Sequence, residues 1–114
     1  MQQTRIVNLR VEPFDVYIGR MGRGEDGYFG NPYRVRDTCM RCKQFHPDAA
    51  STIPCFRSYF EERLTYEPEF RERVHALLGK TLGCFCKPGP CHGDVLVEYL
   101  EQRFRPLVEH RTLR

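Results

Sequence analysis

Thiol, imidazole and carboxylate side chains are concentrated between Cys84 and Asp94, where the chain reads Cys-Phe-Cys-Lys-Pro-Gly-Pro-Cys-His-Gly-Asp. In a strand, alternation places both Cys84 and Cys86 on one face. The Pro-Gly-Pro turn then brings Cys91 and His92 back toward Cys86. If Cys91 and His92 open a helix, the field at its N-terminus lowers a thiol pKa and attracts an anion. These residue types suit either a metal site or a catalytic group made of Cys86, Cys91, His92 and Asp94.

A second group of cysteines lies earlier in the chain, where two residues separate Cys39 from Cys42. This spacing is typical of the knuckles that hold structural zinc. His46 and Cys55 could complete four ligands locally, or the pair could reach across to the later thiols. Either arrangement would offset the entropy of ordering a long polar loop over 34–54. We predict one structural zinc ion, with Cys39, Cys42, His46 and Cys55 as its ligands.

Between these chemistry-bearing segments and the N-terminus, five glycines fall between Gly19 and Gly30. Such a loop could wrap an anion with its backbone amides, assisted by Arg20 and Arg23. It lacks the Lys-Ser or Lys-Thr ending of a phosphate loop, so a plain surface loop is the alternative. The predicted ligand-binding residues are Tyr17, Gly19, Arg20 and Asn31.

The elements that must position these groups follow from hydrophobic patterning. Short apolar runs predict strands at 5–9, 15–18 and 81–86. Helical spacing predicts one helix that is capped by Ser51 or Thr52, with Pro54 in its first turn. It predicts a second helix from about Glu67 to Gly79 and a third that ends at Pro106.

Helices before and after a buried strand indicate a single α/β domain over 1–114, Rossmann-like, with a short mixed sheet and about three helices. Ligands in such domains usually bind beyond the carboxyl ends of the strands. The loops that leave 15–18 and 81–86 are therefore expected to form one composite site. Its predicted members are Tyr17, Arg20, Asn31, Cys86, Cys91, His92 and Asp94.

Composition limits the class of protein. The 114 residues suffice for one domain, and 40% of them are hydrophobic, which argues against a disordered tail. There is no apolar run of about 18 residues and no signal-peptide pattern, so we expect a cytoplasmic protein without a membrane partner. In that compartment six cysteines indicate metal binding or catalysis. A net charge of +3 suits an anionic small molecule and is low for a dedicated DNA-binding protein.

Several motifs are spread along most of the chain: Asn-Leu-Arg at 8–10, Asp-Val-Tyr-Ile-Gly-Arg at 15–20, Gly-Asn-Pro-Tyr at 30–33, Phe-Arg at 56–57, and Leu-Gly-Cys-Phe-Cys-Lys-Pro followed by Cys-His-Gly-Asp at 82–94. Together they resemble domain of unknown function 4326 (DUF 4326), a family of phage and bacterial proteins. The resemblance implies no reaction, but it marks the same strand-exit loops; a phage-encoded member would act in the host cytoplasm. The stretch from Arg34 to Pro54 looks like an insertion relative to this family, so its Cys39, Cys42 and His46 inherit no role.

Two functional hypotheses follow. In the first, the protein binds or processes a nucleotide, nucleoside or modified base, with Arg20 holding an anion and Asn31 reading polar groups. In the second, it is a zinc-stabilised module without catalysis that binds nucleic acid or protein. Its basic residues would be Arg34, Arg36, Arg41, Lys43 and those of the C-terminus. Neither the reaction nor the oligomeric state follows from the sequence.

Overall fold

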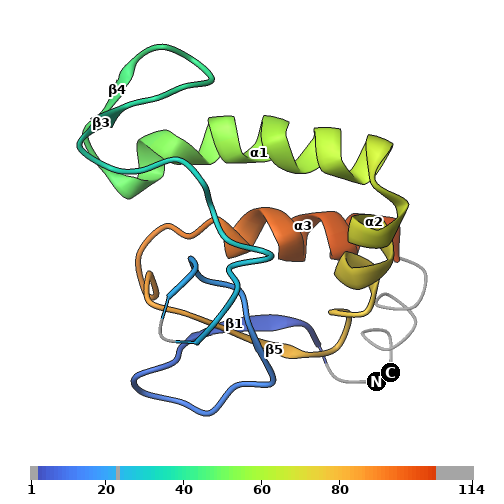
Figure 1. Cartoon of the computed structure of the whole chain (residues 1–114). Coiled ribbons are helices and arrows are strands. Elements are labelled where there is room, and N and C mark those ends of the chain that lie inside the picture. The colour runs from blue at the N-terminus through green and yellow to red at the C-terminus, as the bar shows by residue number, and fades with distance from the viewer. Residues whose placement is uncertain (1–2, 23, 105–114) are drawn as a thin grey trace.

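The computed structural model describes residues 3–22 and 24–104 (Figure 1). Three strands form a parallel sheet: β1 (Arg5–Asn8), β5 (Thr81–Cys84) and β2 (Val16–Tyr17), with β5 in the middle. Leu82 of β5 is fully buried and pairs with both outer strands. The next residue is Gly83, where a Cβ would lie 2.6 Å from the ring of Phe14. The ring therefore packs directly on the backbone of the central strand.

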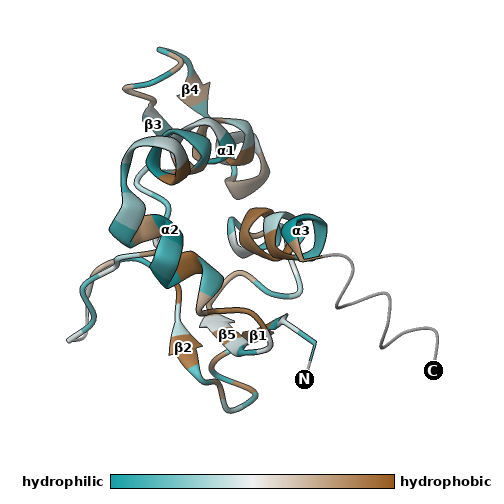
Figure 2. Cartoon of the chain, turned by 90° about the vertical axis from the view of Figure 1, so that its right-hand side faces the viewer, coloured by the Kyte–Doolittle hydropathy of each residue, from teal (hydrophilic) through white to brown (hydrophobic). Residues whose placement is uncertain are grey.

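Three helices lie on the same side of this sheet: α1 (Ala49–Tyr66), α2 (Pro68–His75) and α3 (Gly93–Arg103). Figure 2 shows α2 and α3 next to the sheet and α1 farther from it. The predicted α/β class with three helices is confirmed, and the parallel sheet is consistent with a Rossmann-like arrangement. Within the described residues, none of these helices has the length and apolar character needed to cross a bilayer.

The first helix begins earlier than the sequence predicted. Asp48 is its N-cap, and the Asp48 carboxylate accepts a hydrogen bond from the Ser51 amide at 2.9 Å. Ser51 and Thr52 are therefore already inside the helix, and their predicted capping role is wrong. Pro54 consequently lies beyond the first turn, where it has no amide to donate to the Ala50 carbonyl.

The ends of the later elements also differ from the prediction. The second helix ends at His75 rather than at Gly79. The amides of Leu77 and Leu78 donate to the carbonyls three residues earlier, those of Val74 and His75, which is the pattern of a tight turn and not of an α-helix. Gly79 then adopts a φ of 81°, which closes these turns. The strand β5 stops at Cys84, two residues before the predicted end. Pro106, the predicted end of the third helix, lies outside the described residues.

The stretch predicted to be irregular contains a two-stranded antiparallel hairpin. Its strands are β3 (Asp37–Thr38) and β4 (Phe45–His46), and Figure 1 shows it projecting past the N-terminal end of α1. Both strands are short, and three of their four residues are exposed. So small a polar hairpin is marginal in isolation and needs an attachment to the rest of the domain.

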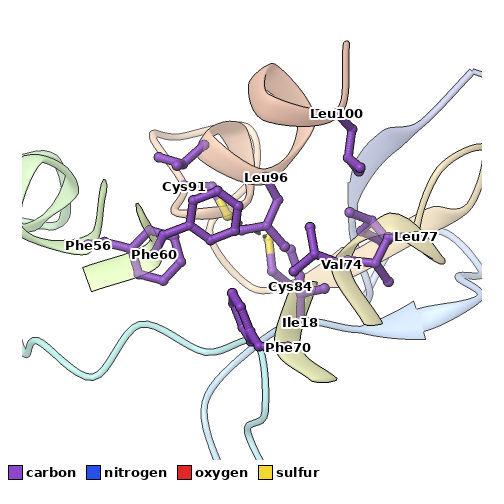
Figure 3. Packing of buried hydrophobic residues seen from close by; sticks show 12 residues of the cluster. Ile18, Phe56, Phe60, Phe70, Val74, Leu77, Cys84, Cys91, Leu96 and Leu100 are labelled. Carbon is purple, nitrogen blue, oxygen red and sulfur yellow. Dashed lines mark hydrogen bonds between the residues drawn. The ribbon is translucent and has the colours of Figure 1, made fainter. Parts of the chain in front are cut away.

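The core lies between the sheet and the helices, and Figure 3 shows its apolar side chains packed around two sulfur atoms. Those sulfurs belong to Cys84, at the end of β5, and Cys91, just before α3. Both cysteines are almost fully buried. The other buried members of this cluster are Ile18, Phe56, Phe60, Phe70, Val74, Leu77, Leu82, Val95, Leu96 and Leu100.

Candidate functional site

The four side chains predicted to bind zinc come together where the hairpin meets α1. Cys39 and Cys42 belong to the turn of the hairpin, His46 lies in β4, and Cys55 lies in α1. One ligand atom from each of the four lies within 4.8 Å of the others. We call this group the hairpin cluster. Its members are close enough to hold a metal ion, and thiolate and imidazole donors suit a soft or borderline metal.

The electrostatics of the hairpin cluster favour one negative charge. Burial opposes ionisation of Cys39, but amides of Cys42 and Arg41, together with His46 and Cys55, lower the pKa of its thiol to about 6. The two amides reach the Cys39 sulfur at 3.4 and 3.3 Å. Burial and the neighbouring thiols raise the pKa of Cys55 to about 12. A bound cation would remove this imbalance by stabilising further thiolates.

Three cysteines form a second group, which we call the floor cluster: Cys84, Cys86 and Cys91. Their sulfurs lie within 4.8 Å of one another, and those of Cys84 and Cys91 are 3.2 Å apart. Cys84 and Cys91 are buried, whereas Cys86 is exposed. The predicted turn does return the chain, because the Gly89 amide donates to the Cys86 carbonyl at 2.8 Å.

The thiol with a lowered pKa in the floor cluster is not the one next to α3. Hydrogen bonds from the Cys86 and Cys91 thiols, and from the amides of Cys86 and Lys87, lower the pKa of Cys84 despite its burial. Bonding to Cys84 raises the pKa of Cys91, although the Gly93 amide at the start of α3 acts in the opposite direction. Hydrogen bonding within the floor cluster therefore favours a thiolate at Cys84 over one at Cys91.

A cavity of about 380 Å³ opens beside the floor cluster, beyond the carboxyl ends of β2 and β5. We call it the strand-exit pocket. It is lined by six of the eight residues predicted for ligand binding or catalysis, namely Tyr17, Gly19, Arg20, Asn31, Cys86 and His92. Cys91 lies beneath it in the core, and Asp94 is outside it in an ion pair with Lys87 at 2.6 Å. The two strand-exit loops thus meet at one pocket, but two of the eight predicted residues do not line it.

Arg20 is held at the rim of the strand-exit pocket. Its guanidinium donates to the Tyr33 carbonyl at 2.5 Å, and the Tyr17 hydroxyl donates to the Arg20 carbonyl at 2.7 Å. Partial burial and the neighbouring Arg34 lower the pKa of Arg20. An arginine nonetheless stays charged at neutral pH, so Arg20 offers the pocket a fixed cation.

His92 is a buried, neutral histidine with a fixed orientation. Its Nε2 lies 2.6 Å from the Ile18 carbonyl, which can only accept, so the ring proton is assigned to Nε2. Burial is the main cause that lowers the pKa of His92. Although it occupies the N-cap position of α3, its side chain caps no amide there. The unprotonated Nδ1 faces the Cys91 sulfur at 3.8 Å.

Asn31 has its side-chain hydrogen bonds inside the protein. Its NH2 group donates to the Thr52 hydroxyl at 2.9 Å, and its oxygen accepts from the Tyr33 amide at 2.9 Å. Asn31 therefore fastens the glycine-rich loop to α1 and shapes one wall of the pocket.

Sequence reasoning missed several residues of the pocket, including Arg10 and Phe85. The guanidinium of Arg10 lies 4.9 Å from the centre of the Phe85 ring. Strand alternation would have put Phe85 on the face opposite Cys84 and Cys86, but β5 ends at Cys84 and the rule no longer applies beyond it. The Asn-Leu-Arg motif was the available signal for Arg10.

Of the basic residues predicted to bind nucleic acid, Arg41 is engaged within the protein. Its guanidinium donates to both carboxylate oxygens of Glu62, at 2.8 and 2.9 Å, and to the Tyr33 hydroxyl at 2.7 Å. These bonds raise the pKa of Arg41 and join the hairpin to α1. Arg34, Arg36 and Lys43 are exposed. Of the basic C-terminal residues of that hypothesis, Arg103 ends α3, and the others lie among 105–114, outside the described residues.

A protein-family model described as "Domain of unknown function (DUF4326)" matches residues 1–102. The chain belongs to the DUF4326 family. A relative in Enterobacteria phage T4, named "Uncharacterized 12.4 kDa protein in nrdA-td intergenic region", is 31% identical over 101 residues, which are 89% of this chain and 81% of that protein. No solved structure matches the chain. The DUF4326 match spans both cysteine clusters and the strand-exit pocket.

Proposed function

We propose that this DUF4326 protein binds or processes a nucleotide, nucleoside or modified base in the strand-exit pocket. The observation that carries the proposal is the position of Arg20, a fixed cation beside aromatic side chains at the carboxyl ends of two parallel strands. Parallel α/β domains usually bind ligands at this end of the sheet. The cavity volume lies within the range of small-molecule sites.

The lining of the pocket suits the two parts of a nucleotide. Tyr17 and Phe85 are in edge-to-face contact, with ring centres 6.4 Å apart, and offer apolar surface to a base. Arg20 and Arg10 both line the pocket and suit a phosphate, since one guanidinium group can donate to two phosphate oxygens at once. His92, kept neutral by burial, lines the pocket without adding a charge.

We further propose that the hairpin cluster holds a structural zinc ion. Three thiols and one imidazole form a closed set of four donors, which is typical of structural rather than catalytic zinc. The amides that point at Cys39 favour its thiolate form, as a metal ligand requires. Such an ion would fix the hairpin to α1 and thereby order the loop that leads away from Asn31.

Calorimetric titration with a panel of nucleotides, nucleosides and bases tests the ligand proposal. We expect micromolar or tighter binding of at least one phosphorylated compound and about tenfold or greater weakening in Arg20→Ala, since a charge-assisted hydrogen bond is lost. Arg57→Ala is the matched control because Arg57 pairs with Glu98 on the surface, away from the pocket. Absence of binding across the panel, or equal affinity in all three proteins, would contradict the proposal.

One observation favours the alternative of a binding module without catalysis. The hairpin exposes two large apolar side chains, Met40 and Phe45, which are 84% and 58% exposed, together with the cations Arg36 and Lys43. Exposed aromatic and basic groups are what single-stranded nucleic acid recognises. In this alternative, a gel-shift signal in low salt is strong for the natural protein and lost in the Arg36→Glu, Lys43→Glu double variant. Absence of a gel shift in low salt would contradict nucleic-acid binding by the hairpin.

A further inference from the structure

All six cysteines of the chain belong either to the hairpin cluster or to the floor cluster. We propose that the floor cluster is a second metal site, which takes one thiophilic ion such as Zn²⁺ on three thiolates and turns its fourth coordination position toward the strand-exit pocket. The inference deepens the proposed function, because it gives the same pocket a metal centre. The inference rests on the proposed function for one point, the nature of the fourth ligand, which the pocket would supply.

The spacing of the sulfurs fits a metal better than it fits core packing. In a tetrahedral zinc site, Zn–S bonds of about 2.3 Å separate the sulfurs by about 3.8 Å. The sulfurs of the floor cluster are compatible with this value, since those of Cys84 and Cys91 are 3.2 Å apart and every pair lies within 4.8 Å. Apolar packing accounts for two buried cysteines but gives no reason for the exposed Cys86 to converge on them.

The two clusters share a backbone arrangement. In the hairpin cluster, the Cys39 sulfur accepts hydrogen bonds from the amides two and three residues later. In the floor cluster, the amides of Cys86 and Lys87, two and three residues after Cys84, likewise lower the pKa of the Cys84 thiol. The Cys91 sulfur accepts from the Gly93 amide, two residues later, at 3.3 Å. Amides aimed at sulfur stabilise thiolates, the form that binds metal.

The surroundings also balance the charge of such a site. Three thiolates and one divalent cation carry a net charge of −1. Arg20 interacts electrostatically with Cys86 from the pocket side, and Lys87 does so with Cys84 and Cys91. The amino-terminal end of α3 adds a favourable field next to Cys91. A buried anionic centre is therefore compensated by Arg20 and in part by Lys87, which also pairs with Asp94.

The fourth position falls on the pocket side. Cys84 and Cys86 line the strand-exit pocket, whereas Cys91 lies behind them in the core. The Nδ1 atom of His92 lies 3.8 Å from the Cys91 sulfur, but His92 offers no nitrogen within 4.8 Å of all three sulfurs, and its Nε2 is committed to the Ile18 carbonyl. A water molecule, or a nitrogen or oxygen donor of the pocket's ligand, would complete the site. Three protein ligands and one exchangeable position are the pattern of catalytic zinc.

Counting metal ions by native mass spectrometry tests the second site. Cys42 and Cys86 are each the exposed member of their cluster, so Cys42→Ser and Cys86→Ser form a matched pair with little disturbance of the core. We expect two ions in the natural protein, one in each single variant and none in the double variant, with circular dichroism confirming the fold. An equal ion count in Cys86→Ser and the natural protein would overturn the proposal. So would a Cys84–Cys91 disulfide in protein purified without oxygen.

Cobalt spectroscopy tests the exchangeable position. Co²⁺ bound to Cys42→Ser protein would occupy the floor cluster, and we expect its visible absorption to shift when imidazole or cyanide is added. Co²⁺ bound to Cys86→Ser protein would occupy the closed hairpin cluster and should not respond. An unchanged spectrum in the first protein would overturn the open position. Neither measurement uses a nucleotide, so failure of the nucleotide titration with two ions present would refute only the ligand proposal.

Discussion

Asn31 shows how one buried amide determines the shape of the pocket. It is 7% exposed, and the Thr52 hydroxyl to which it donates is also buried and donates in turn to the Ala49 carbonyl. The loop that carries Arg20 is thereby connected to the first turn of α1. We therefore expect the Asn31 side chain to affect ligand binding by fixing the position of this loop, in addition to any direct contact with a ligand.

Removal of this amide should destabilise the fold. We expect Asn31→Ala to lower the free energy of unfolding by about 1–3 kcal/mol, because the Tyr33 amide loses its acceptor and the buried Thr52 hydroxyl loses its donor. Urea denaturation measures the change. A double-mutant cycle with Thr52→Val checks the cause. The loss of stability in the double variant should be smaller than the sum of the losses in the two single variants. Full additivity would show that this hydrogen bond is not the cause.

His75 gives the protein a pH dependence of known sign. It stacks on Tyr99 and shares a 2.7 Å hydrogen bond with the Tyr99 hydroxyl. Burial, followed by the charges of Arg103 and Arg71, lowers the pKa of His75. The unfolded chain therefore takes up this proton more readily than the folded one. The contribution of His75 is complete above the unfolded pKa and is lost as the pH falls below it.

The measurement compares urea midpoints at about pH 7 and about pH 5, on either side of the usual histidine pKa. The natural protein should lose more stability between these values than His75→Gln, which keeps a hydrogen-bonding group for Tyr99 but does not titrate. Equal losses in the two proteins would contradict the assignment.

At the scale of elements, the hairpin and α1 depend on each other. Two attachments connect them: the Arg41–Glu62 pair, and the hairpin cluster with Cys55 on the helix. The ion pair lies largely at the surface, where water and salt screen it, and it contributes little to stability. A four-ligand metal site contributes far more, since its binding free energy adds to folding. The proposed metal ion is therefore expected to be the dominant attachment.

Hydrogen exchange can separate these two contributions. In Cys42→Ser, the amides of Asp37–Thr38 and Phe45–His46 should lose protection, while those of Thr81–Cys84 keep it, because the parallel sheet has its own core. Arg41→Ala serves as the comparison and should change the hairpin only slightly. Equal loss of protection in β5 would show that the hairpin does not open independently.

The same elements explain what the sequence could predict. The sheet strands were found because they are apolar runs, and β5 is buried along most of its length. The hairpin was missed because its strands are polar, short and largely exposed, so no alternation marks them. The start of α1 was misplaced because Asp48, Ser51 and Thr52 are all good caps, and only tertiary context selects Asp48.

The functional residues divide in a similar way. Residue type and spacing were enough to propose the four members of the hairpin cluster, and the structure brings them together. The pocket required more, because Arg10 and Phe85 reach it only through the register of the parallel strands and the turn after Cys84. Such positions depend on contacts between segments far apart in the chain, which periodicity does not report.

At the scale of the whole molecule, Arg63 connects three segments that meet around the aromatic part of the core. From α1 its guanidinium donates to the Tyr28 carbonyl at 3.1 Å, pairs with Glu67 at 3.1 Å, and lies 3.9 Å from the centre of the Phe70 ring of α2. The loop before the hairpin, the helix α1 and the helix α2 therefore share one largely buried cation. Such a planar cation can stack and donate at the same time.

Substitution of Arg63 should consequently weaken the entire domain. We expect Arg63→Lys to lower the free energy of unfolding by about 1–3 kcal/mol, because an ammonium group keeps the charge but cannot stack on Phe70 while it donates to Tyr28 and Glu67. Arg57→Lys is the control: Arg57 pairs with Glu98 at the surface, and its change should stay below about 1 kcal/mol. Thermal and urea unfolding, monitored by circular dichroism, measure the change in the free energy of unfolding for both variants. If the two substitutions cost the same, the stacking and hydrogen bonds of Arg63 would contribute no more than a surface ion pair.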